Sequence, residues 1–298
     1  MSCFGEAMTV IIISSSADPA STNIKNCLLE NTLWAEIDMF CNNPVYRNIA
    51  LEDIFLVTIN DSKIRHENID KEIKNKLNII PKQAIFISRH TSKMGKQTLT
   101  VHPIGNYSKA EFGGKQKTLV QSAPRLMTNL LRLIKKNLQT TSLNYQVCFE
   151  VTHHGPYLEI PTLFVEVGST ENEWSNKEPA NIIAQSLLEL LEKYRCEEDF
   201  SDDAPVLVGV GGGHYAPRFT DVVFEKNAAF GHMIPYYHIE AGNIDEDAFE
   251  KALQATPNVS GIYIHKKSLK KSQVTEYKKL FQDKGISVIS SKELTSLK

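Results

Sequence analysis

The chain has 298 residues, 42% of them hydrophobic, and is therefore long enough to fill the core of one large domain or of two smaller ones. Its 33 Lys and Arg residues against 35 Asp and Glu residues give a net charge of -2. This balance excludes a general attraction to nucleic acid, so any contact with RNA requires a local basic patch. The sequence has neither an apolar run of about 18 residues nor a basic start followed by an apolar core, and we expect a cytoplasmic protein that crosses no membrane.

The cysteines are scattered, odd in number and without a C-x-x-C pair. They are Cys3, Cys27, Cys41, Cys148 and Cys196. This spacing favours reduced thiols over a disulfide framework or a zinc ribbon. We therefore expect any bound metal to be held by histidine and carboxylate side chains.

The first third of the chain alternates between strand-like and helix-like segments. The segments are strands at 9–14, 54–59 and 84–88 and a short charged helix at 68–77. Asp18 and Pro19 have the residue types of a helix N-cap and a first helical position. Residues 1–7 show no periodic pattern, and we expect them to be an extension. The β-α-β-α-β order predicts a mixed, largely parallel sheet with helices on both faces.

Histidines follow several of the predicted strands. His90 and His102 come shortly after two of them, and another apolar run ends in His153 and His154 before a Gly-Pro turn. Side chains alternate along a strand, so this pair reaches one site only if the turn begins at His154. Neutral imidazole suits zinc and titrates near neutrality, which indicates metal ligands or general bases. Backbone groups can also satisfy a strand-end histidine, and the pair alone leaves both interpretations open; four such histidines favour a shared site.

The segment 106–121 is polar and carries lysines and two aromatic side chains. Such loops suit RNA ends, where bases stack on aromatic rings and phosphates pair with lysine. A solvated loop is an equally good interpretation. The segment 122–138 that follows is typical of an amphipathic helix, and its basic C-terminal residues would widen a basic surface.

A buried strand at 206–210 leads into three glycines, then His214 and Arg218. The run is not a Walker loop, because no Gly-Lys-Ser/Thr follows, and His214 occupies the place of the third glycine of a dinucleotide fingerprint. Glycines allow close approach by a ligand, and their N–H groups can hold an anion or oxyanion. We interpret the run as functional, with His214 as base or ligand and Arg218 as a fixed charge.

The remaining sequence returns to alternating helices and strands. These are helices at 245–253 and 272–283 and strands at 261–265 and 286–289. A second basic cluster, usually the mark of a solvated segment, consists of Lys266, Lys267, Lys270 and Lys271. No linker or internal repeat separates domains, so we predict a single α/β domain over residues 1–298.

Six segments together carry a family resemblance. They are SRH at 88–90, TVHPIGN at 100–106, THHGP at 152–156, EVGSTENEW at 166–174, GGGHYAPR at 211–218 and GHMIPYY at 231–237. In this order they resemble the D-aminoacyl-tRNA deacylase family of archaea and plants, the second type of that activity. The resemblance implies hydrolysis of the ester between a D-amino acid and the terminal ribose of tRNA, a quality-control step of translation. It also implies zinc dependence and a three-layer α/β/α sandwich similar to phosphorylases and peptidyl-tRNA hydrolases.

For this chemistry we hypothesise that zinc ligands come from His90, His153, His154 and His214, not necessarily all for one ion. Glu171 would be the general base, with His153 and His214 as further catalytic groups. The backbone amides of Gly212 and Gly213 would face the oxyanion. The other predicted substrate contacts are Arg89, His102, Asn106, Arg218, His232 and Tyr237. The expected partner is the acceptor end of D-aminoacyl-tRNA, and the expected assembly is a monomer or a small homo-oligomer.

Three alternatives remain open from the sequence. A metal-free hydrolase similar to peptidyl-tRNA hydrolase would use a histidine base oriented by Asn106. A non-catalytic module would bind tRNA without cleaving it, although near-neutral charge is poor for tight passive binding. A nucleoside-handling enzyme with the same fold would use Tyr236 and Tyr237 in its base and ribose pockets.

Overall fold

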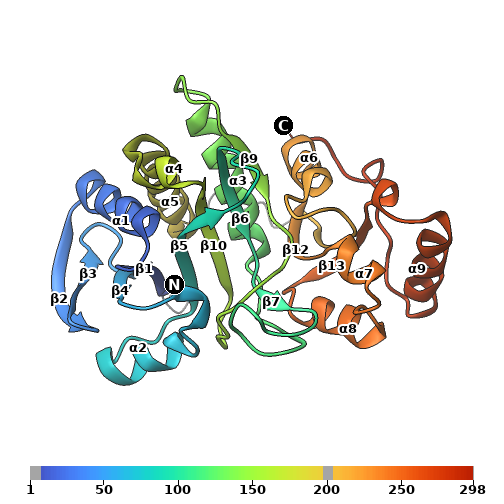
Figure 1. Ribbon diagram of the computed structural model, residues 1–298, viewed down its shortest axis with the longest axis horizontal. Coiled ribbons are helices and arrows are strands. Elements are labelled where there is room, and N and C mark those ends of the chain that lie inside the picture. Colours follow the sequence, from blue (N-terminus) through green and yellow to red (C-terminus); the bar gives the residue numbers. More distant parts are fainter. Residues whose placement is uncertain (1–7, 197–203, 298) are drawn as a thin grey trace, which may run out of the picture.

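The computed structural model describes residues 8–196 and 204–297, so the extension expected at 1–7 lies outside the described residues. Within these ranges most strands belong to one eight-stranded sheet (Figure 1). Its strands lie in the order β2 (Trp34–Phe40), β3 (Asn43–Asn48), β4 (Ile54–Ile59), β1 (Val10–Ser15), β5 (Gln83–Thr91), β10 (Thr162–Ser169), β6 (Thr98–His102) and β9 (Gln146–Phe149).

The centre of this sheet is parallel and its edges are mixed. Strands β4, β1, β5 and β10 run side by side in one direction. At one edge β2 and β3 form an antiparallel hairpin, and towards the other edge β6 runs antiparallel to β10. The mixed, largely parallel sheet predicted from the alternation of elements is confirmed.

Helices cover both faces of the sheet and complete a three-layer α/β/α sandwich. Side chains of β1 alternate between two cores, with Val10 and Ile12 in one and Ile11 and Ile13 in the other. The first core is covered by α1 (Pro19–Asn31), α3 (Pro124–Leu138) and α5 (Lys177–Cys196), and the second by α2 (Ile69–Leu77).

A second, parallel sheet carries the C-terminal part of the chain, drawn in orange and red in Figure 1. Its strands lie in the order β12 (Ala229–Ile234), β11 (Val206–Val210) and β13 (Val259–Ile264). Leu207 and Phe230 join the larger core of the first sheet, together with Phe219 of α6 (Pro217–Glu225). On the opposite face Val208 and Ile262 pack with residues of α8 (Glu246–Gln254) and α9 (Lys271–Asp283).

Several short elements connect these layers. They are η1 (Lys63–Arg65), β7 (Gly105–Asn106), β8 (Thr118–Leu119), α4 (Glu171–Ser175), α7 (Tyr236–Glu240) and η2 (Lys266–Ser268). In the described parts of the chain, no helix combines the length and apolar character that a membrane span needs.

Strand β9 is shorter than the sequence predicts, and the difference shapes the site. It ends at Phe149, whereas we expected it to continue to His153. Beyond it, the backbone N–H of Val151 donates to the carbonyl oxygen of His214 at 2.9 Å, and the next N–H donates to Met233 at 3.0 Å. The chain therefore leaves the first sheet and crosses to the second at this point.

Other boundaries also differ from expectation. Strand β5 continues through Thr91, so His90 lies within a strand and not after it. The expected strand at 286–289 is reduced to an isolated bridge between Ile262 and Val288. The β2-β3 hairpin, α6 and β12 were not predicted from the sequence.

Candidate functional site

A cavity of about 720 Å³ opens where the carboxyl ends of the central parallel strands meet the loops that follow them. The turn after β1 and residues 61–64 after β4 form one wall, and residues 88–91 of β5 form the next. Residues of the loop at 105–112 form a further part of the lining. The boundary is completed by His153, His154, Glu166, His214, Tyr237 and His238.

Five histidine rings gather at one end of this region. The ring centroids of His153 lie 4.3 Å from His102, 4.4 Å from His154 and 4.8 Å from His214. His90 stacks against His214 with a centroid distance of 5.6 Å. The structure thus brings together the four histidines proposed as metal ligands and adds His102, which the sequence suggested only as a substrate contact.

The paired histidines converge because the chain turns at His154. This residue has a φ of +45°, in the left-handed region, so the alternation of a strand stops there. Its carbonyl oxygen accepts a hydrogen bond from the N–H of Gly105 at 2.8 Å. His153 forms a bridge with Ile104. The turn therefore begins where it must for the two rings to reach one site.

A glycine on the neighbouring strand makes room for His90. Gly168 of β10 is the register partner of His90 on β5. A Cβ atom at Gly168 would lie 2.9 Å from the Cβ of His90 and 2.6 Å from Oγ1 of Thr98. Only glycine therefore fits between these strands without moving the histidine. Glu166, two residues earlier on β10, lies on the same face of the sheet.

Three of the rings share one hydrogen-bonding pattern. Nδ1 of His102, His153 and His154 lies 3.1, 2.8 and 2.6 Å, respectively, from a backbone carbonyl oxygen close in sequence. A carbonyl only accepts, so Nδ1 carries the proton and, in the neutral ring, Nε2 keeps its lone pair. One nitrogen from each of the three rings lies within 4.8 Å of the other two.

Two buried carboxylates lie among the rings, and our sequence analysis singled out neither. Glu150, fully buried after β9, approaches Nε2 of His214 at 3.0 Å and Nδ1 of His90 at 3.1 Å. Glu166 lies 3.4 Å from His90 and 3.8 Å from Nε2 of His102. A signal was present in the sequence, since a lone charged residue inside an apolar strand is rarely tolerated without a partner.

Burial and charge pairing compete for the protonation of these groups. Burial opposes protonation of His90 and His102, but the two carboxylates outweigh it and raise the pKa of both rings. Burial and the neighbouring imidazoles hold the pKa of His153 well below its ordinary value. Burial and the ring of His102 lower the pKa of His154 to about 4. Burial opposes ionisation of the carboxylates, yet their histidine contacts lower the pKa of both.

Several of these buried atoms lack a hydrogen-bond partner in the part of the chain that the structure describes. They are Nε2 of His102 and both carboxylate oxygens of Glu150, which approach histidine nitrogens as ion pairs without forming hydrogen bonds of good geometry. Unpaired buried polar atoms are costly, and a divalent cation would satisfy them. Glu150 also belongs to two further groups of three residues whose ligand atoms lie within 4.8 Å of one another, one with His90 and His214 and one with His102 and Glu166. Imidazole and carboxylate form the donor set of zinc sites, so these residues fit such an ion.

The cavity wall formed by the β1-α1 turn and the segment after β4 contains a buried ion pair. Lys63, only 5% exposed, contacts the carboxylate of Asp18. One oxygen of Asp18 accepts the N–H of Ser21 at 2.9 Å, which confirms the predicted N-cap of α1. The other oxygen accepts the backbone N–H of Arg89 at 2.9 Å. A single carboxylate therefore joins the β1-α1 turn, the segment after β4 and strand β5.

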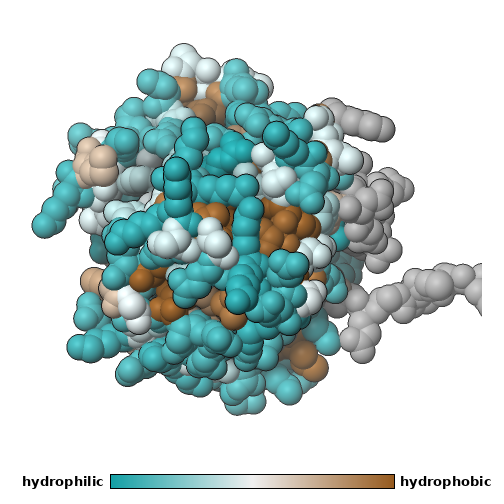
Figure 2. Space-filling model, turned by 90° about the vertical axis from the view of Figure 1, so that its right-hand side faces the viewer, coloured by the Kyte–Doolittle hydropathy of each residue, from teal (hydrophilic) through white to brown (hydrophobic). Residues whose placement is uncertain are grey.

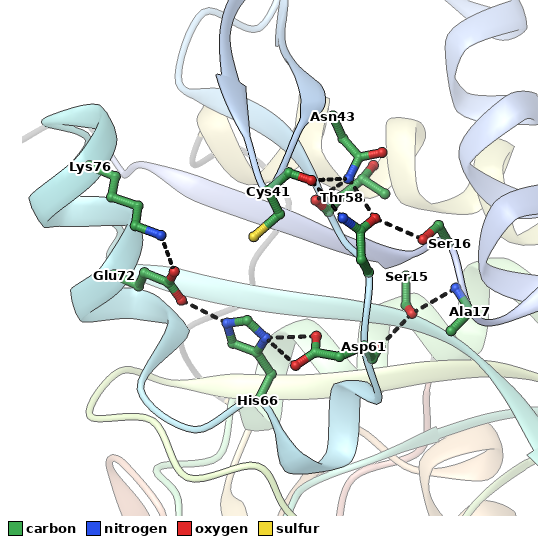
Figure 3. Close-up of polar contacts among 11 residues, drawn as sticks. Ser15, Ser16, Ala17, Cys41, Asn43, Thr58, Asp61, His66, Glu72 and Lys76 are labelled. Carbon is green, nitrogen blue, oxygen red and sulfur yellow. Dashed lines mark hydrogen bonds and ion pairs between the residues drawn. The ribbon is translucent and has the colours of Figure 1, made fainter.

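A polar network supports the segment that follows β4 (Figure 3). The hydroxyl of Ser15 donates to the carbonyl oxygen of Asp61 at 2.7 Å. The ring of His66 lies between two carboxylates, with Nδ1 2.8 Å from Asp61 and Nε2 2.7 Å from Glu72. Carboxylates only accept, so both ring nitrogens carry protons. Burial opposes this charge, but the two carboxylates outweigh it and raise the pKa of His66.

Three of the predicted substrate contacts line the cavity: Arg89, Asn106 and Tyr237. The guanidinium of Arg89 lies 5.1 Å from the ring of Trp174 and is otherwise exposed. The side-chain amide of Asn106 donates to the carbonyl oxygen of Gly113 at 2.9 Å, so it holds the loop in shape.

Other predicted site residues do not line the cavity. Glu171 is exposed at the first position of α4, because β10 ends at Ser169 and the chain turns away. Gly213 is likewise not among the lining residues, and the N–H of Gly212 donates to the hydroxyl of Ser268 at 2.8 Å. One of the two backbone amides proposed to face the oxyanion, that of Gly212, is therefore already hydrogen-bonded to Ser268.

Arg218 and His232 are also held elsewhere. Nε of Arg218 donates to the hydroxyl of Tyr263 at 2.9 Å. His232 is fully buried in β12, where its ring contacts the carbonyl oxygen of Val120 at 2.9 Å and the hydroxyl of Thr152 at 3.1 Å. Burial lowers the pKa of His232 to about 4. Arg218 therefore links α6 to β13, and His232 links β12 to the segments that contain Val120 and Thr152.

Comparisons with known proteins agree with the sequence resemblance. The sequence model of a family described as D-aminoacyl-tRNA deacylase matches residues 78–289. A D-aminoacyl-tRNA deacylase from Thermococcus onnurineus is 38% identical, and one from Pyrococcus horikoshii 37% identical, each over 94% of this chain and 98% of the relative. A crystal structure of a conserved protein of unknown function superimposes with a TM-score of 0.85 at 30% identity, covering 98% of both chains. The chain belongs to the D-aminoacyl-tRNA deacylase family.

Proposed function

We propose that this protein hydrolyses the ester bond of D-aminoacyl-tRNA, with a zinc ion held by His102, His153 and His154. Family membership supports the reaction. The single observation that carries the metal assignment is the set of three rings whose Nδ1 atoms are occupied by backbone carbonyls, because such contacts orient histidine ligands in metal sites. When bound, zinc supplies Lewis acidity to an ester carbonyl and acidifies water.

His214 acts as general base in this proposal, with Glu150 as its orienting partner. The His214 side chain is 38% exposed and lines the cavity, and its Nε2 lies 3.0 Å from the buried carboxylate. With the Nε2 proton directed at Glu150, Nδ1 is free to accept a proton from the attacking water, and the carboxylate stabilises the resulting imidazolium. Glu171 receives no role here, because it lies outside the cavity.

The proposed substrate determines the roles of the remaining cavity residues. Arg89 is an exposed cation beside the histidine cluster and suits a phosphate of the RNA end. Tyr237 offers a ring on which the terminal base can stack. Aminoacyl-tRNA is used in translation, so this substrate implies a cytoplasmic location.

The test is release of amino acid from matched D- and L-tyrosyl-tRNA, together with the metal content of the purified protein. We expect D-selective release that a chelator abolishes and added zinc restores. H102A and H153A should lose both metal and activity. H214A should keep its metal and lose about 10²–10⁴-fold in kcat, the usual contribution of a general base.

His265 provides a matched control, because it is half-buried and does not line the cavity. H265A should keep both metal and turnover. Full turnover by the metal-free protein would favour the metal-free esterase over the zinc-dependent enzyme. Binding of tRNA without release of either amino acid would contradict the hydrolase and favour the non-catalytic tRNA-binding module.

A further inference from the structure

Positive charge is concentrated in one segment that the proposed chemistry does not use. Six lysines against one glutamate give residues 266–279, called here the lysine segment, a net charge of +5 in a chain of net charge -2. The lysines are Lys266, Lys267, Lys270, Lys271, Lys278 and Lys279. The rest of the protein is therefore clearly acidic.

The lysine segment is exposed and unpaired. All six lysines are exposed, and none forms an ion pair with another residue that the structure describes. Several exposed lysines elsewhere are paired with carboxylates, for example Lys71 with Glu159 at 2.5 Å. Lys284, directly after the same helix α9, contacts Glu250 at 2.6 Å. The segment thus keeps its charge available for an external anion.

The lysine segment begins at the same edge of the second sheet as the loops that carry the cavity residues His214 and Tyr237. Strands β11, β12 and β13 are parallel, and their carboxyl ends lead into His214, Tyr237 and the lysine segment, respectively. The hydroxyl of Ser268, inside the segment, accepts the N–H of Gly212 at 2.8 Å. This bond ties the start of the segment, with Lys266, Lys267 and Lys270, to the turn that carries His214, and the remaining lysines follow along α9.

We infer that the lysine segment is a docking surface for the phosphate backbone of tRNA beyond its acceptor end. The inference rests on the proposed function. A cavity of about 720 Å³ has the size of a small-molecule site, so it holds the terminal nucleoside and amino acid while the body of the tRNA lies outside. The acidic remainder of the protein repels a polyanion, and the lysine segment attracts it.

The surface around α9 is consistent with such a partner. Figure 2 looks onto the side of the molecule formed by the C-terminal elements, and hydrophilic residues cover most of it. Lysines that are already unpaired bind phosphates without first breaking an ion pair, and each contact releases condensed counterions from the RNA. Binding there should therefore depend strongly on salt.

The test compares hydrolysis of D-aminoacyl-tRNA with hydrolysis of a D-aminoacyl-adenosine ester, which is too short to reach the lysine segment. The variant carries K266A, K267A, K270A and K271A. We expect its KM for tRNA to rise about tenfold or more near 0.1 M salt with kcat unchanged, and the salt dependence of log KM to weaken by about one unit per lysine removed. KM and kcat for the adenosine ester should equal those of the wild type.

The control variant carries K71A, K76A, K136A and K177A, which removes the same charge from exposed lysines that are paired with carboxylates. Its KM for tRNA should change less than about twofold. An unchanged KM for tRNA in the lysine-segment variant overturns the inference, and so does an equal loss on both substrates.

Direct binding of uncharged tRNA, followed by fluorescence anisotropy, separates this inference from the proposed function. Weaker binding by the lysine-segment variant alone supports the docking surface even if the wild type hydrolyses neither ester, a result that would overturn the proposed function. Equal binding by all three proteins overturns the docking surface.

Discussion

His153 and His66 show how neighbours set the protonation of a histidine. Burial and three adjacent imidazoles keep the pKa of His153 low, whereas two carboxylates raise the pKa of His66 against the effect of burial. A neutral ring offers a lone pair to a metal, whereas a protonated ring, such as His102 beside Glu166, must first release a proton. The same residue type therefore suits a ligand role in the histidine cluster and a fixed positive charge in the segment after β4.

The charged His66 should make folding stability depend on pH. Because its pKa is raised on folding, its contribution is fully present below the unfolded value of about 6.5 and is lost as the pH rises through the higher folded value. We expect H66Q to lose about 1–3 kcal/mol of unfolding free energy in mildly acidic solution. Urea unfolding of both proteins across this pH range measures the difference. A penalty that does not shrink in alkaline solution would contradict the assignment.

At the level of elements, α1 and the segment after β4 are joined through Asp18. This residue was predicted only as a helix cap, yet it also holds buried Lys63 and the backbone of β5. The cap is a local property of the sequence, and the ion pair spans 45 residues. The position of the cavity wall therefore depends on an interaction between elements.

We predict strong coupling between Asp18 and Lys63. D18N keeps an oxygen for the cap but removes the charge, and K63M removes the other charge, so each should lose about 3–5 kcal/mol by leaving one buried charge without its partner. The double variant should lose clearly less than the sum. Denaturant unfolding of all four proteins gives the coupling energy. K71M, in an exposed pair, should cost at most about 1 kcal/mol, and additive losses for the buried pair would refute the coupling.

At the level of the whole molecule, the two sheets share one core. Phe219 of α6 is fully buried in the same cluster as Val10 and Ile12 of β1. The segment after β9 adds backbone hydrogen bonds from one sheet to the other. The histidine cluster forms across this junction, with His90 from the first sheet and His214 from the loop after β11.

This shared core predicts that the protein unfolds as one unit. F219A should lower the unfolding free energy by about 3–5 kcal/mol, as expected for a buried phenylalanine, while keeping a single transition. Calorimetry and circular dichroism in denaturant measure both quantities. F112A, at a side chain that is 63% exposed, should change stability by less than about 0.5 kcal/mol. Two separate transitions in the wild type would refute the single-domain prediction.

Local patterns in the sequence were sufficient for much of the fold. The apolar runs of β1 and β4, the Asp18 cap of α1 and the amphipathic helix α3 were all predicted close to their observed bounds. Their signals lie within a few residues of one another, so periodicity and capping chemistry reveal them. The β2-β3 hairpin was missed, because burial along β2 does not alternate regularly.

The sequence by itself determined the family, through six ordered segments, and it identified four of the five clustered histidines as metal-ligand candidates. Only the tertiary structure decided that His102 joins them and that Glu150 and Glu166 lie among the rings. It also decided that Glu171 and Arg218 lie outside the cavity. The physical reason is that burial and charge pairing depend on partners far apart in the chain: Glu150 and His214 are separated by 64 residues in sequence and by 3.0 Å in space.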